Sequence, residues 1–146
     1  MTEVVKVFVY VVSGDGPEAH LLLFESLDEP GFEVPKGAVE RDESVGDAVR
    51  REVHEEAGVS DLRRIHLLGT TLWEEERQHF FVARTSSDGP DRFAHTVTGD
   101  GIDAGFVYRF RWQRLATLDA RRLVQGCGAF FPELTAYLAD SSSASR

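Results

Sequence analysis

Apolar residues are gathered into two short runs near the start of the chain. Residues 4–12 are rich in β-branched and aromatic side chains, and residues 20–24 end in four successive apolar positions. Neither run alternates between apolar and polar residues, which is typical of strands that are covered on both faces. The turn-forming residues 13–16 separate the runs. The pattern therefore predicts two central, doubly covered β-strands.

A helical period follows between Ser44 and Gly58. Ser44 suits an N-cap, Asp47 stands where a capping box has its acid, and Gly58 suits the left-handed residue that ends many helices. Apolar residues at every third or fourth position share one face of this segment. They are Val45, Ala48, Val49, Val53 and Ala57. We predict one helix with this face in the core.

The middle of the chain predicts a hairpin and then a long irregular segment. Residues 62–72 and 79–85 have the composition of strands, and the acidic residues 74–76 form the turn between them. Residues 86–103 contain Gly-Pro and Gly-Asp-Gly sequences and little periodicity. Because long irregular segments in small domains usually carry function, we expect this segment to contribute to a site.

A further strand is predicted over residues 105–112, where two kinds of side chain alternate. One of its faces is entirely aromatic and is expected in the core: Phe106, Tyr108, Phe110 and Trp112. Arg109 and Arg111 lie on the other face. They either face solvent or supply the planar donors that bind substrate phosphate.

Two helices and a polar tail are predicted for the end of the chain. Residues 115–124 and 130–138 are interpreted as helices, and Pro132 falls in the first turn of the second one, where proline is favoured. Residues 141–146 are polar and are expected to be disordered. With strands on both sides of the central helix, residues 1–140 are predicted to form one α/β domain, with a mixed β-sheet between helices.

Composition and charge narrow the functional classes. The chain has 146 residues, enough for a core without disulfides, and its only cysteine, Cys127, is interpreted as a packing residue. A net charge of −9 argues against broad nucleic-acid binding and against anionic membranes as partners. No apolar run reaches the roughly 18 residues of a membrane span, and the first residues lack the order of a signal peptide. We therefore expect a soluble, cytoplasmic protein.

Three acidic residues stand on one edge of the predicted central helix. Glu52, Glu55 and Glu56 are related by steps of three and four residues, so their carboxylates cluster. A solvated acidic face would explain them, but they border the apolar face and follow the turn-forming sequence Pro35-Lys36-Gly37. Clustered oxygen ligands suit a hard divalent cation such as Mg²⁺ or Mn²⁺, which in turn suits phosphate oxygens.

The segment 37–59 resembles the Nudix hydrolase signature, Gly-x5-Glu-x7-Arg-Glu-U-x-Glu-Glu-x-Gly-U, in which U is aliphatic. All nine fixed positions match: Gly37, Glu43, Arg51, Glu52, Val53, Glu55, Glu56, Gly58 and Val59. The resemblance implies a Nudix-like α/β/α sandwich. It also implies metal-dependent hydrolysis of a nucleoside diphosphate linked to another moiety, with Mg²⁺ or Mn²⁺ as cofactor. The signature covers 23 of 146 residues, and the rest of the chain carries no comparably specific motif.

The resemblance implies roles for the signature residues, position by position. The implied metal ligands are Glu52 and Glu56, Glu55 directly or through water, and the carbonyl of Gly37. Arg51 and Glu43 would pair across the loop and the helix and hold the carboxylates in place. Glu52, Glu55 and Arg51 are therefore counted as catalytic residues, and Gly58 as structural support.

In other proteins with this signature the catalytic base lies outside it and differs between branches, so the resemblance does not name the base here. A water-activating carboxylate must approach the metal site from outside the helix. We therefore expect the base in residues 86–103, with Asp103 ahead of Asp100. The alternative is the acidic turn at residues 74–76, although we favour the interpretation of these residues as a charged hairpin tip.

The sequence Pro35-Lys36-Gly37 resembles the variant found in relatives that cleave dinucleoside polyphosphates and diphosphoinositol polyphosphates. Lys36 either adds a mobile cation for a substrate with several phosphates or only balances nearby acids. A nucleobase needs a stacking partner, and three aromatic residues are candidates unless they belong to the core. They are Trp73, Phe93 and Tyr108.

We predict a small-molecule nucleotide substrate, with dinucleoside polyphosphates ahead of nucleoside triphosphates, ADP-ribose and sugar nucleotides. Two other classes of function are weighed against hydrolysis. A non-catalytic nucleotide-sensing module would be expected to lose ligand acids, and this chain keeps all of them. An isomerase would need dedicated acid and base residues that the sequence does not identify.

Overall fold

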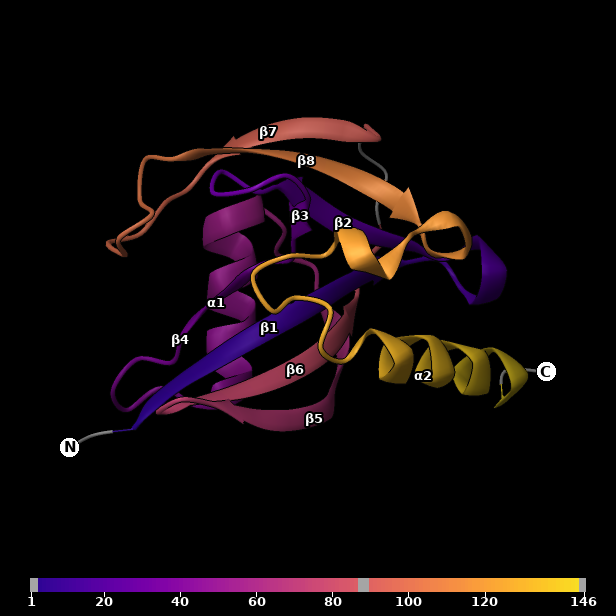
Figure 1. The fold of residues 1–146 in the computed structure, drawn as a ribbon, viewed down its shortest axis with the longest axis horizontal. Helices are drawn as coiled ribbons and strands as arrows, with labels where there is room; N and C mark the ends of the chain where they lie inside the picture. The colour runs from indigo at the N-terminus through magenta and orange to yellow at the C-terminus, as the bar shows by residue number, and fades with distance from the viewer. Residues whose placement is uncertain (1–2, 87–89, 145–146) are drawn as a thin grey trace.

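One mixed β-sheet runs through the molecule, with α1 on one side of it and α2 on the other (Figure 1). The structure is a computed structural model that describes residues 3–86 and 90–144. Its elements, in chain order, are β1 (Val4–Ser13), η1 (Gly16–Glu18), β2 (His20–Glu25), β3 (Phe32–Glu33), β4 (Lys36–Ala38), α1 (Val45–Ala57), β5 (Arg63–Trp73), β6 (Glu76–Arg84), β7 (Arg92–Thr96), β8 (Val107–Arg114), η2 (Leu115–Thr117), η3 (Ala120–Arg122) and α2 (Phe131–Ala144). The predicted α/β sandwich with a mixed sheet is confirmed.

The strand order explains why the sheet is mixed. Its path is β5-β6-β1-β2-β8-β7, with β3 paired to β2 and β4 paired to β1. β1 and β6 run parallel, and the other paired strands are antiparallel. β1 and β2 are therefore central, as their uninterrupted apolar runs predict.

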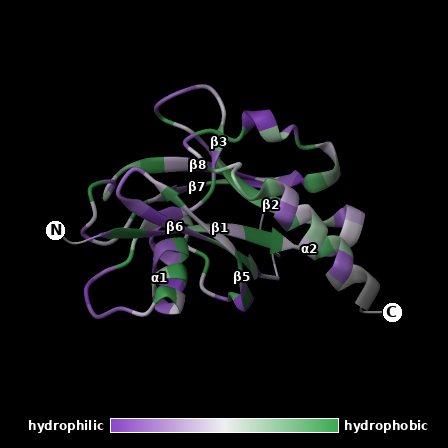
Figure 2. Cartoon of the chain, turned by 60° about the horizontal axis from the view of Figure 1, so that its bottom comes forward, coloured by the Kyte–Doolittle hydropathy of each residue, from purple (hydrophilic) through white to green (hydrophobic). Residues whose placement is uncertain are grey.

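Two clusters of apolar side chains lie on the two faces of the sheet. Residues 7, 9 and 11 of β1 pack beneath α1, whereas residues 8, 10 and 12 point to the opposite face and pack with α2. All six are at most 2 % exposed, so β1 is covered on both faces. Figure 2 shows hydrophobic residues along β1 and both hydrophobic and hydrophilic residues on α1.

β1 and β2 separate from each other after a short contact. They pair only at Val12–Leu21 and Ser13–His20. Farther along, β4 pairs with β1 and β3 pairs with β2, so residues 32–38 lie between the diverging strands. Because α1 packs against β4, the glycine loop that precedes the helix is fixed beside the helix acids.

The helix α1 begins and ends where the sequence predicts. Ser44 Oγ accepts a hydrogen bond of 3.0 Å from the backbone N–H of Asp47. Gly58 has a φ of 74°, in the left-handed region, and its N–H donates to the carbonyl of His54 at 2.9 Å. Four apolar residues on one side of the helix are buried against the sheet: Ala48, Val49, Val53 and Ala57.

Replacing Gly58 by alanine is expected to lower the free energy of unfolding by about 1 kcal/mol or more. A left-handed residue with a side chain costs roughly 1–2 kcal/mol, and the new Cβ would lie 2.9 Å from a ring carbon of His95. Urea denaturation followed by circular dichroism measures the change. Gly46→Ala is the matched control, because its new Cβ meets no atom within 4 Å and alanine favours the helix. Equal midpoints for Gly58→Ala and wild type would contradict this role of Gly58.

Residues 86–103 are less irregular than the sequence predicts, because the strand β7 lies among them. β7 pairs with β8 along its whole length, from Arg92 to Thr96. It is short, its exposed residues alternate with half-buried ones, and turn-forming residues stand on both sides of it. β7 is a strand because it pairs with β8. Its own sequence is too short and too close to turn-forming residues to predict a strand.

The helix predicted over residues 115–124 is wrong. The chain forms the two short turns η2 and η3 and then a bridge between Leu123 and Phe32. Val124 donates its N–H to the Phe32 carbonyl at 2.9 Å. At its end, this segment therefore forms a backbone hydrogen bond with β3 and not with a preceding turn of helix.

The helix predicted over residues 130–138 is present as α2, with Pro132 in its first turn, but it continues to Ala144. It thus includes the first four residues of the segment that we expected to be disordered, and residues 145–146 lie outside the described residues. Among the helices of the described residues, none is long and apolar enough to cross a membrane.

Candidate functional site

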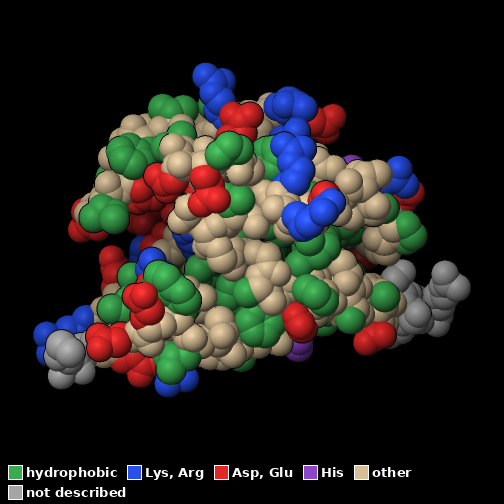
Figure 3. Space-filling view, in the orientation of Figure 1, with side chains coloured by type: hydrophobic (Ala, Val, Ile, Leu, Met, Phe, Trp, Pro, Cys, Tyr) green, Lys and Arg blue, Asp and Glu red, His purple; other side chains and the backbone are tan. Residues whose placement is uncertain are grey.

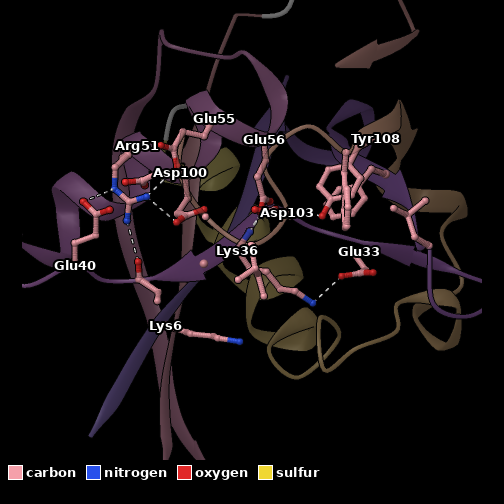
Figure 4. Close-up of a pocket in the computed structure, with 18 of the residues that line it drawn as sticks. Lys6, Glu33, Lys36, Glu40, Arg51, Glu55, Glu56, Asp100, Asp103 and Tyr108 are labelled. Atoms are coloured by element: carbon pink, nitrogen blue, oxygen red, sulfur yellow. Dashed lines mark hydrogen bonds and ion pairs between the residues drawn. The ribbon is translucent and has the colours of Figure 1, made fainter. Parts of the chain in front are cut away.

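A cavity of about 620 Å³ opens where α1, β4 and the connection between β7 and β8 meet. Eight acidic and three basic residues line it, so its formal charge is strongly negative. Figure 3 shows acidic side chains around a hollow at the left of the molecule, and Figure 4 shows the residues that line it. Carboxylates removed from water at this density need a cationic partner.

Arg51 is the cation at the centre of these acids. Its Nε and Nη2 donate to the two carboxylate oxygens of Glu43 at 2.8 and 3.0 Å. Its Nη1 donates to Glu52 at 2.8 Å and to Glu55 at 3.0 Å, and Nη2 also reaches the carbonyl of Ala38 at 2.8 Å. The hydrogen bonds from Arg51 lower the pKa of Glu43. The guanidinium thus ties the helix to the loop before it, through the pairing with Glu43 that the family resemblance implies.

Gly37 lies directly against the Glu52 carboxylate. A Cβ at this position would stand 2.1–2.3 Å from the three carboxylate atoms of Glu52. No residue with a side chain fits there without moving that carboxylate. The glycine therefore lets the loop backbone approach a helix acid closely, which places the Gly37 carbonyl and the Glu52 oxygens in one small region.

Glu56 lies deepest among the helix acids. It is 4 % exposed, and its Oε1 accepts a hydrogen bond of 3.1 Å from the backbone N–H of Lys36. Burial, together with a hydrogen bond shared with the Asp103 carboxyl group, raises the pKa of Glu56 well above its usual range. Burial also raises the pKa of Glu52, to about 7, against the opposing effect of Arg51. Arg51 alone therefore does not compensate the charge of this cluster.

The donor set fits a hard divalent cation. The available ligands are carboxylate oxygens and a backbone carbonyl, which Mg²⁺ and Mn²⁺ prefer, and two of the carboxyl groups have pKa values raised by burial. Across residues 3–86 and 90–144, no three acidic, histidine or cysteine side chains already surround one point as metal ligands. The carboxylates have other partners instead. Glu52 and Glu55 accept hydrogen bonds from Arg51, and Glu56 accepts one from the backbone N–H of Lys36.

The two aspartates expected to include the base both line this cavity. Asp103 accepts a hydrogen bond of 3.2 Å from the hydroxyl of Tyr108 and lies beside Glu56, whereas Asp100 lies nearer Arg51 and Glu55 (Figure 4). The acidic turn does not take part, since Glu74 and Glu75 are absent from the lining and Glu76 pairs with Lys6 at 3.3 Å.

Lys36 lines the cavity, but its ammonium group is engaged. Its Nζ donates to Glu33 Oε1 at 2.6 Å and lies 5.7 Å from the centre of the Phe8 ring. Lys36 thus balances an acid within the cavity, which is one of the two interpretations that the sequence left open. Lys6 lines the same cavity and adds a second ammonium group.

Arg109 and Arg111 do not join the acidic cavity. They line a separate hollow on the other face of the sheet. Arg109 is exposed, and the Arg111 guanidinium lies 4.1 Å from the centre of the Phe32 ring. The strict alternation along β8 is the physical reason, because it turns both arginines away from Tyr108, which does line the cavity.

Of the three aromatic candidates for base stacking, only one lines the cavity. Tyr108 lines the cavity and stacks on Phe24 at a ring distance of 4.2 Å. Phe93 stacks on Phe110 in the core, and Trp73 is exposed at the end of β5, outside the cavity.

Sequence reasoning missed several residues of the lining, among them three apolar ones and a lysine. Leu27, Ile102 and Phe106 are exposed apolar residues at the cavity, and Phe106 is 49 % exposed although we expected it in the core. Phe106 and Tyr108 both line the cavity, so the predicted alternation holds, but at this end the aromatic face meets the cavity and not the core. Lys6 could have been found, because it is the only charged residue within the apolar run 4–12.

Comparison with solved structures finds the same fold in several proteins. The NUDIX domain of Shewanella oneidensis NrtR, complexed with ADP ribose, aligns with a TM-score of 0.67 at 17 % identity over 94 % of this chain and 90 % of that one. A NUDIX family hydrolase from Clostridium perfringens gives 0.62 at 17 % identity, over 94 % and 99 %. A structure from a study of MutT from Aliivibrio salmonicida and Vibrio cholerae gives 0.65 at 20 % identity, over 95 % and 99 %. Among curated proteins, none matches the sequence significantly.

The mixed sheet between helices is the fold of NUDIX hydrolases, and together with the family match that follows it supports the class of pyrophosphohydrolases for this protein. The sequence model of the NUDIX domain matches residues 2–133. The chain belongs to the NUDIX family.

Proposed function

We propose that the chain hydrolyses a phosphoanhydride bond in a nucleoside diphosphate linked to another moiety, with Mg²⁺ or Mn²⁺ as cofactor. The observation that carries this proposal is the gathering of Glu52, Glu55, Glu56 and Asp103 in one acidic cavity beside Gly37. Buried carboxyl groups with raised pKa values destabilise the protein once they ionise, unless a cation neutralises them. A module that only sensed a nucleotide would have no need for the whole set.

In this proposal the helix acids hold the cation. Glu52 and Glu56 bind it together with the Gly37 carbonyl, and Glu55 binds it directly or through water. When bound, the cation polarises the phosphoryl oxygens, stabilises the leaving group and lowers the pKa of the attacking water. Arg51 contributes by fixing the direction of the Glu52 and Glu55 carboxylates.

Asp103 is the proposed base. It lies outside the helix and beside Glu56, and it accepts the proton from water that attacks a phosphorus atom in the cavity. The hydroxyl of Tyr108 donates to Asp103 at 3.2 Å and so orients its carboxylate.

We propose a dinucleoside polyphosphate as the preferred substrate. Lys36 and Lys6 bring two ammonium groups to the cavity, which suits a chain of several phosphates. To bind phosphate, Lys36 must exchange its contact with Glu33, and Lys6 its contact with Glu76. Phe106 and Ile102 offer exposed apolar surface for a nucleobase at the cavity. ADP-ribose is the second candidate, because the similar NUDIX domain of NrtR was crystallised with that ligand.

A panel of nucleotide substrates at equal concentration tests the choice. With Mg²⁺ present, we expect the highest kcat/KM for a dinucleoside polyphosphate, ahead of nucleoside triphosphates, ADP-ribose and sugar nucleotides. Product release is measured by chromatography, with and without excess chelator. A clear preference for ADP-ribose or for one nucleoside triphosphate would contradict the role given to the two lysines. Binding without turnover of any member would favour the sensing module.

The same panel tests the nucleobase contact through Phe106→Ala. Loss of the ring should raise KM for every nucleotide several-fold, since stacking on an aromatic side chain contributes about 0.5–1.5 kcal/mol. Trp73→Ala is the matched control, because Trp73 is 60 % exposed but lies outside the cavity. Equal effects of the two substitutions would contradict the contact.

A further inference from the structure

A second hollow, of about 350 Å³, lies on β7 and β8, on the face of the sheet opposite to the acidic cavity. Arg92, Arg109 and Arg111 line it, and Glu25 is the only acidic residue in its lining. Arg122 is not part of the lining but lies near Arg111, since the two guanidinium groups are 4.9 and 4.1 Å from the centre of the same Phe32 ring. Figure 3 shows basic side chains gathered over β8.

The strand register separates the two sites. Phe24 is paired with Glu33 and faces the acidic cavity, whereas the next pair, Glu25 and Phe32, faces the opposite side. Neighbouring residues of a strand point to opposite faces. The arginine hollow is therefore no extension of the acidic cavity.

None of these four arginines makes an ion pair or a side-chain hydrogen bond within the described parts of the chain. The Nε of Arg111 is moreover buried and has no hydrogen-bond partner. Some exposed arginines elsewhere have partners, as Arg77 pairs with Glu3 and Arg114 with Glu18. Four neighbouring arginines without an ion pair are unexpected in a chain with a net charge of −9.

The register also holds the arginines close to one another. Arg92 stands directly opposite Arg111 in the antiparallel pair of β7 and β8, and Arg109 lies two residues from Arg111 on the same face. Like charges directly opposite each other in a sheet destabilise it. This repulsion, together with desolvation, lowers the pKa of Arg111, with desolvation the larger cause. An anion in the hollow would remove the repulsion and supply the missing partner of the Arg111 Nε.

We propose that this hollow binds the phosphate group of a small phosphate-bearing molecule, at a site separate from the acidic cavity. Guanidinium groups present planar pairs of donors that match phosphate oxygens. Stacking of two of them on Phe32 limits their freedom before binding. The hollow has the volume of a small-ligand pocket, which favours a small molecule over a long polymer. The proposal does not rest on the hydrolytic function.

Calorimetric titration of the full chain with inorganic pyrophosphate, in excess chelator, tests this proposal. Without divalent cations the acidic cavity repels the probe, so binding reports on the arginine hollow. The double variant Arg92→Gln/Arg109→Gln is expected to weaken binding at least tenfold, because two charge-assisted contacts are lost. Both side chains are exposed, so the variant is expected to fold. The matched control is Arg77→Gln/Arg114→Gln, which removes the same charge elsewhere and should change the affinity less than twofold.

Two further probes identify the ligand. Adenosine monophosphate that binds more tightly than pyrophosphate, with the same dependence on Arg92 and Arg109, would indicate a nucleotide, and weaker binding would indicate phosphate alone. The proposal is overturned if the wild type binds neither small probe, or if both double variants lose equal affinity. It is also overturned if a single-stranded oligonucleotide binds through these arginines while the small probes do not.

Discussion

Replacing Glu52 or Glu56 by glutamine is expected to lower kcat by about a hundredfold or more. Glutamine keeps the shape of the side chain but removes the charge, and losing one key electrostatic group in an active site typically costs about 10²–10³ in rate. Both positions lie at the cavity, and Glu52 is held against Gly37. Steady-state kinetics at saturating Mg²⁺ measures kcat, and calorimetry measures the loss of Mg²⁺ affinity.

Asp28→Asn is the matched control for these substitutions. Asp28 also lines the cavity but is exposed, so its charge is solvated and its loss should change kcat less than threefold. Turnover by the wild type in excess chelator would contradict the metal assignment. So would a kcat near that of the wild type in both glutamine variants.

The pH dependence of folding stability shows whether Glu52→Gln loses activity without losing its fold. Burial raises the pKa of Glu52 to about 7, above the ordinary value of 4.5. A carboxyl group whose pKa is raised by folding opposes the folded state as the pH rises from 4.5 through 7, because it must then ionise in a buried place. Without metal, Glu52→Gln should therefore be at least as stable as the wild type at pH 8. Urea midpoints measure this, and a large loss of stability in the variant would show that the kinetic effect reflects unfolding.

Replacing Asp103 by asparagine is expected to lower kcat by about 10²- to 10⁴-fold, the usual contribution of a general base. With Mg²⁺ bound, the helix carboxylates are ionised as ligands, so the acidic limb of the pH–rate profile reports the base. That limb should disappear in Asp103→Asn. The hydroxyl of Tyr108 can still donate to the remaining oxygen of asparagine, so the loop is expected to keep its position.

Asp100→Asn is the control for the base, because it changes the same kind of residue in the same loop and cavity. It should keep the acidic limb and lose less than tenfold in kcat. If Asp103→Asn keeps a wild-type profile and Asp100→Asn does not, the base is Asp100. Unchanged profiles in both would return the role to the signature acids.

The sequence by itself determined the features that depend on near neighbours. Ser44 and Gly58 delimit α1 because an N-cap and a left-handed residue act within one turn of the helix. The spacing of Glu52, Glu55 and Glu56 places their carboxylates together for the same local reason. The apolar runs in β1 and β2 predict their central positions, because a strand covered on both faces cannot alternate.

Only the tertiary structure decided what meets these elements. Asp103 reaches Glu56 because β7 and β8 return the loop between them to α1, and a loop path of this kind depends on strand pairing. The same pairing turns Arg109 away from the acids and leaves Phe106 at the cavity. The present partner of Lys36 also follows from packing, because β3 places Glu33 within 2.6 Å of its ammonium group. Local patterns predict which face of a helix or strand a residue occupies. Contacts between distant segments depend on tertiary packing, which a short stretch of sequence does not predict.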